Sequence, residues 1–134
     1  RGRKALVTEP LREILERDPQ VDLCLAIGPA VMMKSVAETT RPFGVETVVS
    51  LNSIMIDGTG MCGGCRVSVG GRTYFACVDG PEFDGHAVDF DLLMARQRMY
   101  RAQERDALRG VSEPCGIDPA QEAEGPLRRG SGEA

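Results

Sequence analysis

Tryptophan is absent from this 134-residue chain, aromatic residues make up only 4% of it, and histidine occurs once. No apolar run approaches the roughly 20 residues of a transmembrane helix, because Gly28-Pro29 interrupts the longest one, 23–33. The net charge of −4 lacks the basic excess typical of nucleic-acid-binding surfaces. No apolar segment follows the basic start of the chain, so a secretory signal is missing as well. These absences argue against membrane and nucleic-acid partners and leave a small globular protein.

The cysteines indicate a metal or cluster site rather than a disulfide framework. Five are present, an odd number, and three of them lie close together in the sequence. Without a signal peptide, clustered cysteines are typical of ligands in a reducing compartment, so we expect a cytoplasmic protein. Of the other two, Cys24 lies in an apolar segment and Cys115 lies near the end of the chain, and neither is expected to be a ligand.

The first part of the sequence is predicted to have α/β structure. A short helix is expected over 10–16, and strands over 21–27 and 45–51 flank a helix over 30–39. This β-α-β order predicts parallel strands in a three-layer sheet, with the strand at 21–27 covered on both faces. Two strands are too few for a stable parallel sheet, and no Gly-x-Gly-x-x-Gly fingerprint is present. Residues 1–52 are therefore expected to be the second half of a nucleotide-binding domain.

From residue 53 the sequence becomes rich in glycine and in turn signals. Two segments of alternating polarity, 66–69 and 72–78, are joined by Gly-Gly, which strongly favours a β-hairpin. We predict a small [2Fe–2S] domain over 53–110 that contains this hairpin and a C-terminal helix. The composition of 111–134, rich in Gly, Pro, Ser and Glu, predicts a disordered tail.

The predicted C-terminal helix begins after Asp89, a suitable N-cap, and runs to about Arg109. Its second half is basic, since five arginines outnumber two acidic residues: Arg96, Arg98, Arg101, Arg105 and Arg109 against Glu104 and Asp106. Such a run is usually a solvated face, and docking to an acidic partner is the alternative. His86, in a loop before this helix, is expected to be a surface residue.

The strongest chemical signal lies between Asp57 and Cys65. The segment reads Asp-Gly-Thr-Gly-Met-Cys-Gly-Gly-Cys, and Cys77 follows after the hairpin. Cys62 and Cys65 can face one metal from a tight loop, and the glycines let backbone N–H groups approach bridging sulfides. Counting strand pairs from the Gly-Gly turn places Cys77 opposite Gly64, beside this loop.

The residues alone leave three interpretations of this site open. Plant-type [2Fe–2S] proteins use Cys-x4-Cys-x2-Cys and a distant Cys, and Asp57 occupies the first of these positions here. Asp57 is then either a fourth ligand beside the three cysteines or a turn-forming residue before glycine. A structural zinc site is the second interpretation, although such sites usually have two Cys pairs. A set of buried or reactive cysteines is the third.

A second candidate site lies at Gly28-Pro29, where a predicted strand ends and a helix begins. Ligands of open α/β sheets bind at such strand ends, and a helix N-terminus favours a phosphate or a carboxamide oxygen. We predict that Gly28, Pro29 and Met32 contact a ligand. The alternative is that Met32 and Met33 pack in the core.

Four stretches of the sequence resemble a known family. They are Ala26–Lys34, Val49–Asn52, Asp57–Cys65 and Phe75–Gly85. They resemble the small (alpha) subunit of NADH-dependent reduced ferredoxin:NADP oxidoreductase, also called sulfide dehydrogenase, over about residues 5–100. The resemblance implies an FAD-binding barrel, an NAD(H)-binding domain and a C-terminal [2Fe–2S] domain. This sequence would be a C-terminal fragment, without the barrel and the first half of the nucleotide domain.

In that family one Asp and three Cys hold the cluster, which implies Asp57 beside Cys62, Cys65 and Cys77, with NAD(H) at the Gly28 loop. Electrons would pass between NAD(H), FAD and the cluster to a larger flavin and iron–sulfur subunit, with ferredoxin as a further partner. No general acid or base is required, so no catalytic residue is predicted, and the fragment by itself is expected to be inactive.

Two alternative functions remain. The electron-transfer subunit of dihydroorotate dehydrogenase is related, but it has Cys at the position that matches Asp57. A zinc-stabilised interaction module that uses the basic helix is an alternative of another class.

Overall fold

The computed structural model describes residues 2–110, so the predicted tail at 111–134 and Cys115 lie outside the described residues. Contacts divide the chain into two units after Met99, and each unit is described by itself. None of the helices in the described part is both long and apolar enough to cross a membrane.

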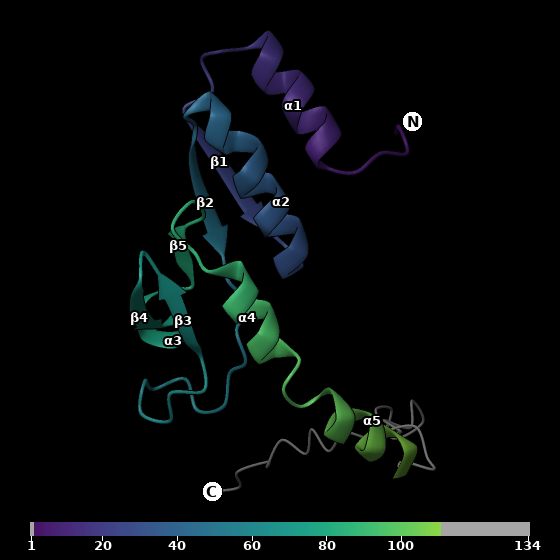
Figure 1. Ribbon diagram of the computed structural model, residues 1–134, viewed down its shortest axis with the longest axis vertical. Helices are drawn as coiled ribbons and strands as arrows, with labels where there is room; N and C mark the ends of the chain where they lie inside the picture. Colours follow the sequence, from purple (N-terminus) through teal and green to yellow (C-terminus); the bar gives the residue numbers. More distant parts are fainter. Residues whose placement is uncertain (1, 111–134) are drawn as a thin grey trace, which may run out of the picture. The chain divides into compact units, whose positions relative to one another are not determined.

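The first unit contains a three-stranded sheet with the strand order β1-β2-β5. β1 (Leu23–Ile27) and β2 (Glu46–Ser50) are parallel, which confirms the predicted β-α-β unit. β5 (Glu82–Asp84) pairs antiparallel with β2 (Figure 1). The sequence does not reveal β5, which comes from the segment assigned to the cluster domain.

Two helices precede and follow β1. α1 (Thr8–Arg17) packs against α2 (Ala30–Thr40), and α2 packs on β1 and β2. After α2, a 3-10 turn (Arg41–Phe43) ends at Gly44, whose φ of 67° lets the chain turn into β2. Both helices lie close to their predicted positions.

The outer face of β1 differs from the prediction. Side chains alternate along a strand, and Leu23, Leu25 and Ile27 are 49%, 64% and 74% exposed, while Ala26 between them is buried. In the described residues α2 covers one face of the sheet (Figure 1). The expected three-layer arrangement, with this strand covered on both faces, is therefore wrong for the described part of the chain.

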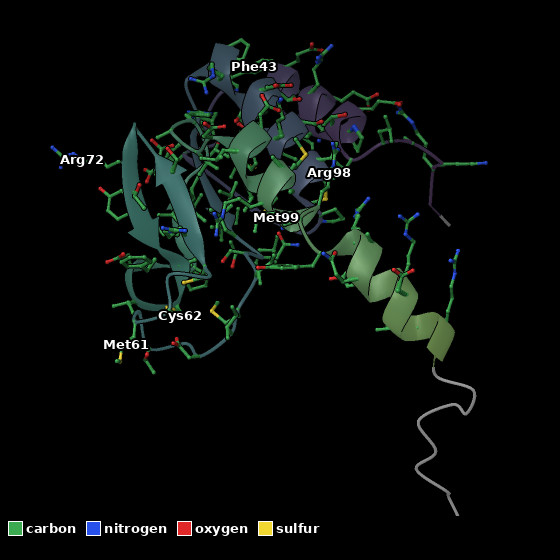
Figure 2. All side chains as sticks on the ribbon, turned by 60° about the horizontal axis from the view of Figure 1, so that its bottom comes forward. Phe43, Met61, Cys62, Arg72, Arg98 and Met99 are labelled. Carbon is green, nitrogen blue, oxygen red and sulfur yellow. The ribbon has the colours of Figure 1, made fainter. Side chains whose placement is uncertain are left out.

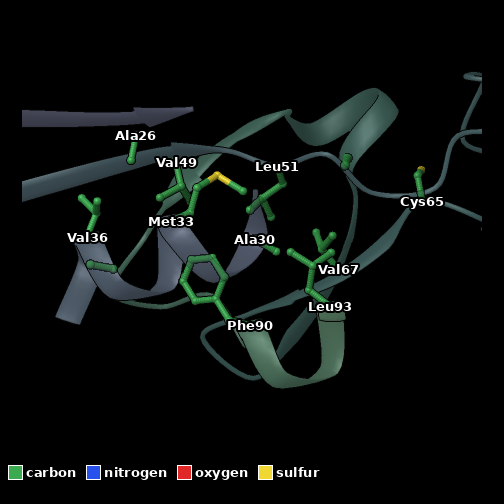
Figure 3. Close-up of a cluster of buried hydrophobic side chains, with 12 residues drawn as sticks. Ala26, Ala30, Met33, Val36, Val49, Leu51, Cys65, Val67, Phe90 and Leu93 are labelled. Atoms are coloured by element: carbon green, nitrogen blue, oxygen red, sulfur yellow. The ribbon is translucent and has the colours of Figure 1, made fainter. Parts of the chain in front are cut away.

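One apolar core joins the α/β segment to the segment that follows. Met33 of α2 and Val49 of β2 have no exposed surface, and Phe90 and Leu93 pack into the same cluster (Figure 3). Residues from both sides of position 52 thus share one core. The division into domains at this position stays a prediction.

The predicted hairpin is present, with a shorter second strand. β3 (Arg66–Val69) and β4 (Arg72–Phe75) are joined by Gly70 and Gly71, whose φ values of 57° and 76° suit this two-residue turn. The chain then forms a helical turn, α3 (Ala76–Asp79), where the sequence predicts continued strand.

The predicted C-terminal helix is two helices. α4 (Phe90–Gln97) is capped by Asp89, whose Oδ1 accepts the Leu92 N–H at 2.9 Å, as predicted. α5 (Arg101–Gly110) belongs to the second unit, where the side chains of residues 101–109 are exposed. One uninterrupted helix to Arg109 is therefore wrong, and no proline or glycine marks the break.

His86 is more enclosed than predicted. Its Nε2 lies 3.0 Å from Oγ1 of the buried Thr40, which lies 2.6 Å from Oγ1 of the buried Thr47. Arg41 donates a hydrogen bond to the His86 carbonyl at 2.7 Å. The loop after β5 is thereby attached to α2 and β2, and His86 is partly buried and hydrogen-bonded where the sequence predicts a surface residue.

Candidate metal centre

The segment between β2 and β3, residues 52–65, is a glycine-rich loop that we call the cluster loop. Gly60 has a φ of 82°, and an added Cβ would lie 2.8 Å from Val78 Cγ2. A Cβ at Gly64 would lie 2.9 Å from Ile56 Cδ1. A side chain at either position would have to displace the Val78 or Ile56 side chain, so the glycines let the backbone pass closely around the predicted ligands.

Asp57 accepts two backbone hydrogen bonds inside the cluster loop. Its Oδ1 accepts the Thr59 N–H at 2.8 Å, and its Oδ2 accepts the Cys62 N–H at 3.1 Å. These bonds, chiefly the one from Thr59, hold the pKa of Asp57 below its usual value. The carboxylate is therefore ionised at neutral pH, which is the form that binds metals. It shapes the turn and lies beside Cys62, and its role as a ligand stays a prediction.

Cys65 and Cys77 are brought together by the hairpin and α3. Their sulfur atoms are 3.2 Å apart, and the Ala76 N–H donates to the Cys65 carbonyl at 3.2 Å. The Asp79 carboxylate accepts the Phe75 N–H at 2.7 Å, which turns the chain into α3 and aims Cys77 at Cys65. The predicted proximity of Cys77 to the Cys62–Cys65 loop is correct, although Cys77 lies in a helical turn and not in the strand.

The two paired thiols differ in acidity. Burial alone would raise the pKa of Cys65, but hydrogen bonds from the Cys77 backbone and thiol bring the pKa below its usual value. The pKa of Cys77 is raised, first because its thiol shares this hydrogen bond with Cys65 and second through burial. The two thiols share one hydrogen bond, and ionised thiols are the metal-binding form.

Cys62 lies at the exposed side of the site. Figure 2 shows Met61 and Cys62 in the outer part of the cluster loop, and the Cys62 sulfur accepts the Gly64 N–H at 3.3 Å. Such an N–H···S contact is the kind of backbone hydrogen bond that iron–sulfur ligands receive. Cys24, by contrast, is partly buried against the core, where burial raises its pKa, as expected of a cysteine that is not a ligand.

The donors lie in two neighbouring pairs: Asp57 accepts the Cys62 N–H, and the Cys65 sulfur lies beside the Cys77 sulfur. Across residues 2–110, no three His, Cys, Asp or Glu side chains surround one point as a single metal ion requires. A structural zinc ion takes four such ligands in one tetrahedron. A [2Fe–2S] cluster takes two protein ligands on each iron. The chemistry and pairing of these donors therefore fit a [2Fe–2S] cluster.

The second candidate site begins at the end of β1. Pro29 precedes α2, and its carbonyl accepts the N–H groups of Met32 and Met33 at 2.8 and 3.1 Å. The Met32 side chain lies so close to Gly28 that an added Cβ there would be 2.7 Å from Met32 Cε. The structure thus brings Gly28, Pro29 and Met32 together at a helix N-terminus. Met33 is a core residue and Met32 is partly buried against the core, as their alternative interpretation states.

Two residues that the sequence does not single out contact the cluster loop from α4. Arg96 donates from Nη2 to the Gly64 carbonyl at 3.1 Å. Gln97 donates from Nε2 to the Asn52 carbonyl at 2.8 Å and to its side-chain oxygen at 3.0 Å. In the sequence Arg96 is one arginine of a charged run and Gln97 a neutral residue beside it, so only the fold could reveal these contacts.

Residues 52–89 match the family described as the iron–sulfur cluster binding domain of dihydroorotate dehydrogenase B. The matched range contains all four predicted ligands and ends at the cap of α4. The segment with the predicted ligands is therefore similar to an iron–sulfur cluster binding domain.

Similarity to known proteins extends beyond this domain. A Clostridium beijerinckii protein described as "uncharacterized protein in adh 3′ region" is 50% identical over 111 residues, which are 82% of this chain and 38% of that protein. A Thermotoga maritima homolog of the dihydroorotate dehydrogenase B (NAD(+)) electron transfer subunit is 52% identical over 104 residues, 78% of this chain and 36% of that protein. A solved structure of a NADH-dependent reduced ferredoxin-NADP oxidoreductase, from work on flavin-based electron bifurcation, is 51% identical with a TM-score of 0.73.

The chain is a relative of such electron-transfer subunits. The match to the solved structure covers 81% of this chain and 39% of that chain, and it confirms both the resemblance and the mixed α/β fold class. The chain spans less than two fifths of the length of these relatives.

Proposed function

We propose that this chain holds a [2Fe–2S] cluster through Asp57, Cys62, Cys65 and Cys77 and is the electron-transfer segment of a flavin and iron–sulfur oxidoreductase subunit. The observation that carries the proposal is the 3.2 Å approach of the Cys65 and Cys77 sulfurs inside a matched iron–sulfur binding domain. When bound, such a cluster supplies one-electron transfer, which a flavin can couple to the two-electron chemistry of a nicotinamide.

The residues of the site have separate tasks in this proposal. Cys65, only 2% exposed, excludes water from its side of the site and provides a thiol 3.2 Å from that of Cys77. Cys77 is fixed against it by α3. Asp57 contributes a carboxylate that is already ionised, and Cys62 binds at the exposed side, where electrons can enter or leave.

For the second site we propose NAD(H) as the ligand of Gly28, Pro29 and Met32. The start of α2 offers unpaired N–H groups and the positive end of a helix dipole, which favour a phosphate or a carboxamide oxygen. The close approach of Met32 to Gly28 supports a role of glycine at this position, since a larger residue would displace the methionine.

The partners follow from the same proposal. We propose a larger flavin and iron–sulfur subunit as the heterodimer partner, ferredoxin as a further partner, FAD in the complete subunit and NADP among the nicotinamides that the complex uses. Clustered free cysteines fit a reducing, cytoplasmic environment. The chain alone, whose described strands form a three-stranded sheet and one hairpin, should not oxidise NADH with a dye acceptor. Turnover by the purified chain would contradict this.

Anaerobic reconstitution tests the cluster. The chain is incubated with ferrous iron, sulfide and a thiol reductant, desalted, and assayed for iron, acid-labile sulfide and electron paramagnetic resonance after reduction. We expect equal amounts of iron and sulfide and the spectrum of a reduced [2Fe–2S] centre. Binding of zinc with no retained sulfide would instead support the zinc-stabilised interaction module.

The matched domain favours a second candidate, an electron-transfer subunit of a dihydroorotate dehydrogenase. Asp57 separates the two candidates, since that subunit has Cys at this position. Co-purification of the complete protein with its partner subunit, followed by assay with dihydroorotate, would test it. Reduction of the flavin by dihydroorotate would favour this candidate over the ferredoxin-linked one.

A further inference from the structure

The last turn of α4 contacts the cluster loop at both of its ends. Gln97 binds the carbonyl and side-chain oxygens of Asn52, where the loop begins, and Arg96 binds the carbonyl of Gly64, where it finishes. The two donors are consecutive in the sequence, whereas their acceptors lie 45 and 32 residues away from them. One helical turn therefore holds the two ends of the loop that carries Asp57 and Cys62.

α4 itself is firmly attached to the rest of the first unit. Phe90 and Leu93 are buried in the core, and the Asp89 side chain caps the first turn. Lys34 of α2 forms an ion pair with Asp91 at 2.8 Å. The helix is thus a fixed reference, and the contacts of Arg96 and Gln97 transmit its position to the loop.

The cluster loop has little burial of its own to hold it. Residues 55–59 are exposed, as are Met61 and Cys62. Buried apolar contacts are the usual source of rigidity, and a segment without them opens at low free-energy cost. Hydrogen bonds at its two ends are therefore expected to matter more here than in a well-packed segment.

We propose that Arg96 and Gln97 are positioning residues for the cluster, a clamp that keeps the cluster loop in the shape required to bind and retain it. The inference rests on the proposed function, because it gives these residues a role toward the same site. Gln97 acts through hydrogen bonds alone. Arg96 adds a positive charge beside Gly64, the neighbour of the ligand Cys65.

The positive charge of Arg96 should also affect the reduction potential of the cluster. A centre held by three thiolates and a carboxylate is negatively charged, and reduction adds one more negative charge. A nearby cation stabilises the reduced form more than the oxidised form, so it raises the reduction potential. Removing the charge of Arg96 should lower the reduction potential, whereas removing the neutral Gln97 contact should leave it unchanged.

Four variants of the full chain separate these effects. Arg96→Gln removes charge and guanidinium, Arg96→Lys keeps the charge but loses the planar donor group, and Gln97→Leu removes the donor from a side chain of similar length. Arg98→Gln is the matched control, because Arg98 is an exposed arginine two residues beyond Arg96 (Figure 2). Each is reconstituted anaerobically, and cluster release to an iron chelator, midpoint potential and melting temperature of the cluster-free protein are measured.

We expect release to be about tenfold faster in Arg96→Gln, the size of effect expected for one hydrogen bond to a charged group. Gln97→Leu and Arg96→Lys should release the cluster a few-fold faster. Only Arg96→Gln should move the midpoint potential, to a more negative value. Arg98→Gln should match the original chain in both measurements, and the cluster-free melting temperature should stay unchanged throughout.

Several outcomes would overturn the clamp. Release rates of Arg96→Gln and Gln97→Leu equal to those of Arg98→Gln would show that the contacts do not hold the loop. A lowered cluster-free melting temperature that accounts for the faster release would assign these residues to general stability. If the original chain binds no cluster at all, the proposed function fails first, and that failure is distinct because it appears before any variant is compared.

Discussion

In the core of the first unit Met33 and Val49 have no exposed surface, whereas in the cluster loop Met61 is 88% exposed and Ile56 70%. The core residues come from α2 and β2 and gain stability from apolar burial, which does not depend on any bound group. The loop is shaped by glycines, by hydrogen bonds to Asp57 and by contacts from α4. The stability of the fold should therefore not depend on the cluster. Binding of the cluster should be sensitive to substitutions that leave the fold intact.

The largest effect expected from this difference is complete loss of the cluster without loss of the fold. Serine at Cys62, Cys65 or Cys77 removes one of the proposed thiolate ligands, so iron and sulfide should be absent after anaerobic reconstitution and gel filtration. Serine at Cys24 or Cys115 should leave the iron content unchanged. Circular dichroism checks that all five variants keep their helices.

Two results would contradict this assignment. Full iron content in the Cys77→Ser variant would remove Cys77 from the site, even though its sulfur lies beside Cys65. Loss of iron in Cys115→Ser would give a role to a residue that we do not count among the ligands.

A core substitution should lower the stability of the fold, which the cysteine substitutions leave intact. Met33→Ala leaves a cavity in the packed cluster around α2 and should lower the free energy of unfolding by about 2–5 kcal/mol. Met61→Ala, at an exposed position of the cluster loop, should change it by less than about 0.5 kcal/mol. Urea unfolding of the cluster-free chain measures both. Equal losses of unfolding free energy in the two variants would mean that the cluster loop contributes as much to stability as the core does.

The fold was predictable wherever local chemistry decides it. The Gly70-Gly71 turn requires positive φ, and Asp89 offers a carboxylate to free N–H groups, so both features can be read from a few residues. β5 is three residues long and forms because the chain returns to pair with β2. No local residue pattern predicts this long-range pairing. The exposed outer face of β1 was also unpredictable, because apolar composition does not say what covers a strand.

The candidate site also has features that local residues predict and features that depend on the fold. The spacing of the cysteines predicts the ligand set, which stays a prediction, and the hairpin turn correctly predicted that Cys77 returns to the loop beside Cys65. Its helical conformation was missed because it depends on the Asp79 carboxylate, which accepts the Phe75 N–H. The contacts of Arg96 and Gln97 reach across 32 and 45 residues, so they follow from the packing of α4 and not from any local motif.

Exchanging a ligand tests the site more finely than removing one. Asp57→Cys should keep the iron content, because the resulting Cys-x4-Cys-x2-Cys spacing is that of plant-type [2Fe–2S] proteins. A thiolate donates more electron density to iron than a carboxylate, so the electron paramagnetic resonance of the reduced protein and its reduction potential should change. Asp57→Ala should bind the cluster but lose it faster to a chelator.

The outcome decides between the two interpretations of this aspartate. If Asp57 only shapes the turn, the Asp57→Cys variant would give the same resonance spectrum as the original chain. That result would remove Asp57 from the ligand set while leaving the three cysteines in place.

The smallest expected effect compares two glycines, one in each region. Gly44, before β2, and Gly60, in the cluster loop, both have positive φ, where alanine costs about 1–2 kcal/mol. A Cβ at Gly44 meets nothing within 4 Å, so Gly44→Ala should lower the free energy of unfolding by roughly that amount and leave cluster loading unchanged. A Cβ at Gly60 would lie 2.8 Å from Val78 Cγ2, in a loop that can shift locally. Because the loop can shift to relieve part of this strain, Gly60→Ala should lower the free energy of unfolding by less than Gly44→Ala does, but it should slow cluster loading several-fold, measured as the rise of visible absorbance during reconstitution. Normal loading in Gly60→Ala together with a clear loss of stability would show that the loop is part of the cooperative core, and the contrast between the two regions would not hold.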